Sequence, residues 1–88
     1  MIKIHAGTSF KKAYKKNVKN KKEKNDFKIL LELFTEDPFN PKLKTHKLSG
    51  KLKGLYAFSC GYDCRVVFKF LDSENVLLVD IGKHDEVY

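Results

Sequence analysis

Apolar residues recur every three or four positions in two stretches of the N-terminal half, which is the spacing of helices that pack one face on a core. The first stripe follows an N-cap signal in Gly7-Thr8-Ser9 and consists of Phe10, Ala13, Tyr14 and Val18. The second lies within Glu23 to Glu36, ends at Asp37-Pro38, and consists of Phe27, Leu30, Leu31 and Phe34. Two amphipathic helices are therefore predicted, joined by a polar turn over Asn17 to Lys22.

Elsewhere apolar and polar residues alternate, which is the period of a β-strand. The predicted strands are Met1 to His5, Leu55 to Cys60, the run that begins at Arg65, and Leu77 to Ile81. Asp72-Ser73-Glu74-Asn75 turns the last two into a hairpin, and Gly82 ends the final strand. The basic stretch from Asn40 to Lys53 is interpreted as a connection.

This order, strand-helix-helix-strand-strand-strand, predicts an α+β fold with two N-terminal helices packed on a mostly antiparallel sheet. With 88 residues the chain is expected to form a single domain over residues 1–88, with one modest core.

The net charge of +7 is unevenly distributed. Residues 1–53 hold 15 basic and 5 acidic side chains, and residues 54–88 hold 3 and 6. A basic surface attracts phosphate backbones by releasing their counterions. RNA or ribosome binding is therefore expected of a set of lysines in the first 53 residues: Lys11, Lys12, Lys15, Lys16, Lys19, Lys21, Lys22, Lys47, Lys51 and Lys53. A merely solvated helix face is the alternative.

Other features narrow the class of protein. No segment reaches the length of a membrane span and no signal peptide is evident, so a cytoplasmic location without membrane contact is expected. Cys60 and Cys64 flank a tight turn and are expected to be free thiols in a reducing compartment. The histidines are scattered and no Cys-x-x-Cys spacing occurs, so neither a metal nor another cofactor is expected.

Three motifs in the C-terminal half carry a family resemblance. They are His46-x-Leu48-x-Gly50-x-Leu52-x-Gly54, Asp63-x-Arg65-Val66-Val67-Phe68 and Ile81-Gly82-x-His84-Asp85-Glu86-Val87-Tyr88. Together with the element order, they resemble the RelE/ParE superfamily of type II toxins, nearest the YafQ-like and RelE-like messenger RNA interferases. The resemblance implies a RelE-like fold and an endoribonuclease that cuts mRNA in the ribosomal A site. It also implies a cognate acidic antitoxin protein that silences the toxin.

The same resemblance implies a set of site residues. The YafQ pattern places histidines at His46 and His84, an aspartate at Asp63 and an aromatic residue at Tyr88. The RelE pattern supplies Arg65 and again Tyr88.

This chain departs from both patterns in the strand after Gly54. Ala57 and Ser59 stand where RelE has catalytic lysines and YafQ another histidine. The identity of the general base is therefore open, with Asp85 and Glu86 as weaker candidates beside His46.

RNA cleavage without a metal needs a base for the 2′-hydroxyl, a cation for the charge that develops on phosphorus, and an acid for the leaving 5′-oxygen. Histidine titrates near working pH, so His84 is the predicted proton donor. The planar fork of Arg65 suits a phosphate clamp. Tyr88 is predicted to stack a base or to contact the phosphate.

Three of the candidate site residues also have a purely structural interpretation. Arg65 can pair with Asp63 or Glu86 to steady the hairpin, His46 can order its loop through a backbone hydrogen bond, and Asp63 can cap a turn. Two other functions fit the sequence as a whole. One is a ParE-like gyrase inhibitor, and the other is a non-catalytic RNA- or ribosome-binding module.

Overall fold

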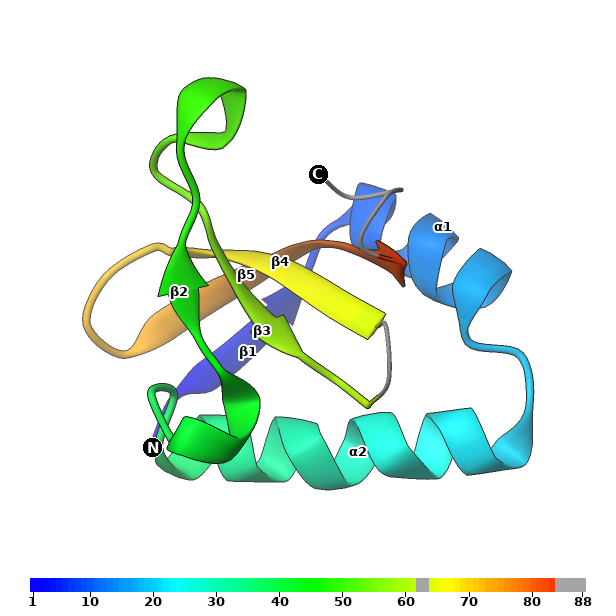
Figure 1. Cartoon of the computed structure of the whole chain (residues 1–88). Helices are drawn as coiled ribbons and strands as arrows, with labels where there is room; N and C mark the ends of the chain where they lie inside the picture. The colour runs from blue at the N-terminus through cyan, green and yellow to red at the C-terminus, as the bar shows by residue number, and fades with distance from the viewer. Residues whose placement is uncertain (62–63, 84–88) are drawn as a thin grey trace.

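Two helices lie against one face of a five-stranded sheet (Figure 1). The structure, a computed structural model, describes residues 1–61 and 64–83. The helices are α1 (Thr8–Asn17) and α2 (Lys21–Glu36), and two short 3₁₀ turns are η1 (Pro41–Leu43) and η2 (Gly50–Leu52). The strands are β1 (Lys3–Ala6), β2 (His46–Lys47), β3 (Tyr56–Ser59), β4 (Cys64–Phe70) and β5 (Asn75–Lys83). The predicted α+β class is confirmed.

The sheet order is β1-β5-β4-β3-β2, so the first and last strands of the chain are neighbours. β1 pairs with β5 in parallel, and the other pairs are antiparallel. A parallel pair needs a long crossover, which the two helices supply between β1 and the rest of the sheet. The mostly antiparallel sheet is thus a mixed one, with its single parallel pair at one edge.

Both predicted helices form around their apolar stripes, and only α2 also has a side-chain cap at its start. Asn20 caps α2 by accepting a 2.8 Å hydrogen bond from the Glu23 backbone N–H, and its amide donates in return to the Glu23 carboxylate at 2.6 Å. The chain leaves the helix at Asp37, directly before Pro38. α1 starts after Gly7, whose side chain cannot cap it, so packing rather than capping stabilises this helix.

The core lies between the helices and one face of the sheet. Phe34 of α2 is fully buried, with its ring 4.8 Å from that of Phe58 and 4.9 Å from that of Phe68. Phe10, Tyr14 and Phe27 form a second aromatic group where α1 meets α2. These aromatic residues pack inside the molecule, and the core therefore accounts for the apolar stripes of both helices.

The turn between β4 and β5 has the predicted sequence. Asp72 accepts hydrogen bonds from the backbone N–H groups of Glu74 and Asn75, both at 2.8 Å. The Asn75 side chain in turn bonds to His5 at 2.9 Å, which ties β1 to the same turn. This polar network holds the turn of the β4–β5 hairpin, and Arg65 lies at the other end of that hairpin.

The structure corrects three details of the sequence-based prediction. β2 is a fifth strand inside the stretch interpreted as a connection, and it forms because His46 and Lys47 pair with β3. β5 runs through Gly82 to Lys83 because Gly82 and Lys83 pair with Arg65 and Cys64 of β4.

The third correction concerns Cys60 and Cys64, which form a disulfide and are not free thiols. The turn between β3 and β4 brings their Cα atoms to 5.1 Å, a separation that a disulfide can bridge.

Candidate functional site

Arg65 and His46 lie on the sheet face that points away from the helices. The opposite, core-facing side of β3 and β4 is marked by the buried pair Phe58 and Val66. Side chains alternate along a strand, so the residues next to this pair share the other face. Lys69 is on this face too, farther along β4, and the part around Arg65, called the Arg65 face below, comprises His46, Ala57, Ser59, Arg65, Val67, Asp80 and Gly82.

These residues form two rows across the strands. One row runs from His46 through Ala57 and Val67 to Asp80. The next row holds Ser59, Arg65 and Gly82. Arg65 therefore has Asp80 diagonally beside it on β5 and His46 on the other side, two strands away.

Arg65 is half-buried, and its Nη1 donates a 3.0 Å hydrogen bond to the backbone carbonyl of Cys64. Within residues 1–61 and 64–83 the single ion pair joins Lys22 and Asp26, so Arg65 is paired with none of the carboxylates described there. A guanidinium anchored by one N–H keeps further donors for a ligand. This arrangement suits a phosphate or another oxyanion.

His46 has a contact with its own loop. Its Nδ1 lies 2.9 Å from the carbonyl oxygen of Lys44, and because a carbonyl can only accept, the ring nitrogen donates. The bond fits the prediction that His46 orders the loop. The same residue is exposed on the Arg65 face, so chemistry at its ring remains a proposal.

Three predicted site residues lie outside the described part of the chain: Asp63, His84 and Tyr88. The weaker base candidates Asp85 and Glu86 lie there as well. The nearest described positions are Cys64 and Lys83, which pair with each other across β4 and β5. Cys64, which follows residues 62–63, and Lys83, which precedes residues 84–88, therefore lie next to Arg65 and its partner Gly82.

Sequence reasoning missed Asp80 and Ser59 as members of the Arg65 face. Ser59 is the cross-strand partner of Arg65, and Asp80 is the partner of Val67. The alternation in β3 carried the signal for Ser59. Asp80 gave no such signal, because its face depends on an irregularity between β4 and β5.

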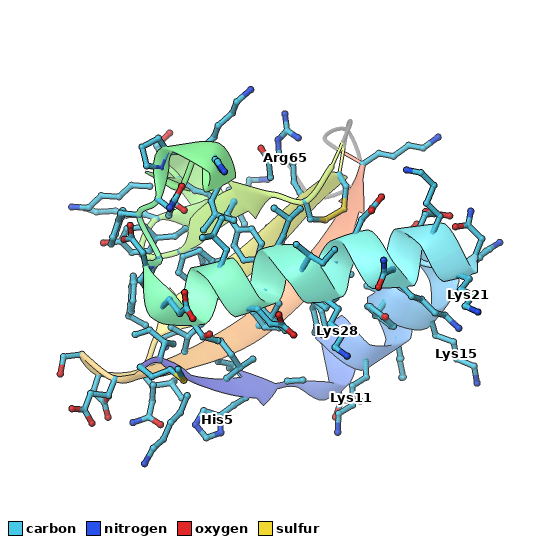
Figure 2. The ribbon with its side chains drawn as sticks, turned by 90° about the horizontal axis from the view of Figure 1, so that it is seen from below. His5, Lys11, Lys15, Lys21, Lys28 and Arg65 are labelled. Atoms are coloured by element: carbon cyan, nitrogen blue, oxygen red, sulfur yellow. A yellow bond between two sulfur atoms is a disulfide. The ribbon has the colours of Figure 1, made fainter. Side chains whose placement is uncertain are left out.

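The predicted docking lysines lie in two separate regions, and all of them are exposed. Figure 2 shows Lys11 and Lys15 of α1 on the far side of the molecule from Arg65, and Lys21 at the end of α2. Lys47, Lys51 and Lys53 lie in β2 and in the β2–β3 connection, and β3 separates β2 from the strand that carries Arg65. Lys47 pairs with Tyr56, which packs on the core, so Lys47 lies on the opposite sheet face from His46 and Arg65. Lys22 is engaged by Asp26 at 3.1 Å.

A hollow of about 480 Å³ lies in the β2–β3 region, lined by Lys47, Lys53 and Tyr56 among others. A second hollow, of about 440 Å³, lies between the start of α2 and the disulfide. No helix in the described ranges is long and apolar enough to cross a membrane. Nor do the described histidine, cysteine and carboxylate side chains gather into a group of three that could hold a metal ion.

Comparison with protein families gives a match over nearly the whole chain. The model of YafQ, a bacterial toxin of type II toxin-antitoxin systems, matches residues 2–88. The chain belongs to the YafQ toxin family. It is thus a type II toxin, as the motifs around His46, Arg65 and His84 indicated. Comparison with curated proteins gives no match.

Solved structures of toxins share the fold. A metal-bound toxin from Helicobacter pylori is 32% identical, with a TM-score of 0.71 and full coverage of both chains. YafQ in the E. coli DinJ-YafQ complex is 24% identical, with a TM-score of 0.79 over 99% of this chain and 97% of that one. A YoeB/ParE toxin from Agrobacterium tumefaciens is 15% identical, with a TM-score of 0.74 over 94% and 99%. The last two likenesses concern the fold alone.

Proposed function

We propose that this YafQ-family toxin is an endoribonuclease that cuts mRNA without a metal, in the ribosomal A site of the cytoplasm, and thereby stops translation. The observation that supports this most directly is Arg65. It is half-buried and anchored to a backbone carbonyl, and it shares a sheet face with His46. An arginine held in this way can bind the scissile phosphate and stabilise the charge that develops in the transition state.

The remaining groups follow from the family pattern. His84 is proposed to protonate the leaving 5′-oxygen, and Tyr88 to stack a base or to contact the phosphate. Asp63 is proposed to orient one of the histidines. The lysines of the helices and of the β2–β3 region are proposed to dock RNA and the ribosome through counterion release.

A cognate acidic antitoxin is the proposed protein partner. The E. coli relative is found in a complex named DinJ-YafQ, and this chain carries a net charge of +7 that attracts an acidic segment. We expect such a segment to fold on binding and to cover the Arg65 face, the basic helices, or both. A complex in which the partner touched neither surface would contradict this part of the proposal.

The test is a cleavage assay on ribosomes programmed with a defined mRNA. The buffer keeps the magnesium that ribosomes need, and a chelator removes other metal ions. We expect cleavage that leaves a 2′,3′-cyclic phosphate and a 5′-hydroxyl. Arg65→Ala should lower the rate at saturation by about 10²- to 10³-fold, the cost of losing one transition-state donor. Mapping RNA 5′ ends by primer extension measures the rate.

Lys69→Ala is the matched control, because Lys69 is an exposed cation on the same strand and four residues from Arg65. It should cut at the rate of the unmodified protein. Intact mRNA together with inhibited DNA supercoiling would instead indicate a gyrase inhibitor. Intact mRNA with tight ribosome binding would indicate a non-catalytic binding module.

A further inference from the structure

The general base is the catalytic group that the family pattern leaves open in this chain. We propose that the carboxylate of Asp80, on β5, is the general base that removes the proton from the attacking 2′-hydroxyl. The proposal rests on the proposed endoribonuclease function and assigns one residue of that same site. It matters because β3 offers Ala57 and Ser59, neither of which is a base at neutral pH.

A β-bulge puts Asp80 on the Arg65 face. Val67 pairs with Asp80, whereas the next residue, Phe68, pairs with Leu78, so Val79 is an extra residue in β5. Strict alternation from buried Leu78 would have turned Asp80 into the core and Ile81 outwards. Because of the extra residue, Ile81 is fully buried and Asp80 faces away from the helices.

The register also puts this carboxylate close to the proposed phosphate clamp. Arg65 pairs with Gly82, so Asp80 is its diagonal neighbour, at a Cα separation of roughly 7–8 Å for such pairs. Both residues lie on the same side of the sheet, and we infer that a phosphate bound by Arg65 comes within reach of Asp80. His46, the other described candidate, is two strands across from Arg65 and offset by two residues, roughly 12 Å away.

The chemical step balances without any further reagent. The 2′-oxygen attacks phosphorus while its proton passes to the Asp80 carboxylate. The bond from phosphorus to the 5′-oxygen then breaks, and that oxygen takes a proton from an acid, which is His84 in the proposed function. The products are a 2′,3′-cyclic phosphate and a 5′-hydroxyl, and release of the proton from Asp80 restores the base.

Asp80 also has a structural contact, which the experiment must separate from chemistry. Its Oδ1 accepts a 2.9 Å hydrogen bond from the backbone N–H of Ile81, next to the bulge. A carboxylate has about four acceptor sites on its two oxygens, so this single bond leaves capacity for a substrate hydroxyl. Asp80→Asn keeps an oxygen for the Ile81 bond and removes the basicity.

The first measurement compares Asp80→Asn with Glu32→Gln, which neutralises an exposed carboxylate on α2. We expect Asp80→Asn to lower kcat by about 10²- to 10⁴-fold with little change in KM or in thermal midpoint, and Glu32→Gln to change none of them. Asp80→Glu should recover part of the rate because it retains a carboxylate. An unchanged kcat in Asp80→Asn, or a loss confined to KM, would overturn the assignment.

The second measurement uses an mRNA with a 5′-bridging sulfur at the scissile position. A thiolate leaves without an acid, so a variant that lacks the acid is rescued and a variant that lacks the base is not. We expect Asp80→Asn to remain slow on this substrate and His84→Ala to recover. Rescue of Asp80→Asn would exclude Asp80 as the base. If the unmodified protein cut neither substrate, the proposed function itself would fail, and Asp80 with it.

Discussion

Asp72 fixes the turn of the hairpin that sets Arg65 diagonal to Asp80. Its carboxylate receives hydrogen bonds from the Asn75 side chain and from the backbone N–H groups of Glu74 and Asn75. The Asn75 side chain is the largest influence, followed by the Glu74 backbone, and together they hold the pKa of Asp72 below its ordinary value of 3.8. The charged form therefore favours the folded state.

The pH dependence follows from the sign of this shift. A carboxyl group whose pKa is lower in the folded state binds fewer protons there, so it adds stability above its unfolded pKa and loses it as pH falls through the folded value. We expect part of the acid destabilisation below about pH 4 to vanish in Asp72→Asn. Urea unfolding midpoints measured from neutral to acid pH test this. Glu36→Gln, which neutralises an exposed carboxylate on α2, should leave the acid slope unchanged.

At the scale of elements, α2 is joined to the sheet through Phe34. This side chain is fully buried and contacts the rings of Phe58 on β3 and Phe68 on β4. Phe34→Ala should lower the free energy of unfolding by about 3–5 kcal/mol, because it leaves a cavity among the aromatic rings. A domain of this size has only about 5–15 kcal/mol in total, so the variant should be close to unfolding.

Ile29→Ala is the matched control on the same helix, since Ile29 is 57% exposed. It should change the free energy of unfolding by about 0.5 kcal/mol or less. Equal losses in the two variants, measured by urea denaturation, would show that α2 is not held mainly by its inward face.

The elements themselves were predictable to different degrees. Both helices and the strands β1, β3 and β4 follow from local periodicity, which depends only on neighbouring residues. β2 has two residues and therefore no period of its own, and it is a strand only because His46 and Lys47 pair with β3. The Cys60–Cys64 disulfide likewise depends on the distance set by the turn between two strands.

At the scale of the whole molecule, the basic side chains face two directions. Lys11 and Lys15 lie on the far side of the molecule from Arg65 in Figure 2, and Lys21 lies at the end of α2, whereas β2 and β3 follow the Arg65 strand in the sheet order. We expect a short RNA on the Arg65 face to contact the second group of lysines more readily than the first, because β2 and β3 adjoin the strand of Arg65. A ribosome is large enough to contact both.

This division can be tested with two triple variants that remove the same charge. Changing Lys11, Lys15 and Lys21 to glutamine should leave the affinity for a short RNA oligonucleotide unchanged and weaken binding to ribosomes. Changing Lys47, Lys51 and Lys53 to glutamine should weaken both. The logarithm of the binding constant falls as the logarithm of salt concentration rises, and each lost phosphate contact should make this negative slope shallower by about 0.7 to 0.9. Cleavage at saturation should stay constant in the first variant, and a collapse of that rate would refute the division.

The sequence by itself determined the α+β class, the two amphipathic helices, the uneven charge and the family, because these depend on residue types and on their spacing along the chain. It also named Arg65 and His46, which the structure sets on one sheet face. Tertiary structure alone decided the strand order, the pairing of β1 with β5, and the side of the sheet on which Asp80 lies. The physical reason is that register is a relation between strands: one extra residue, Val79, reverses the face of every side chain beyond it.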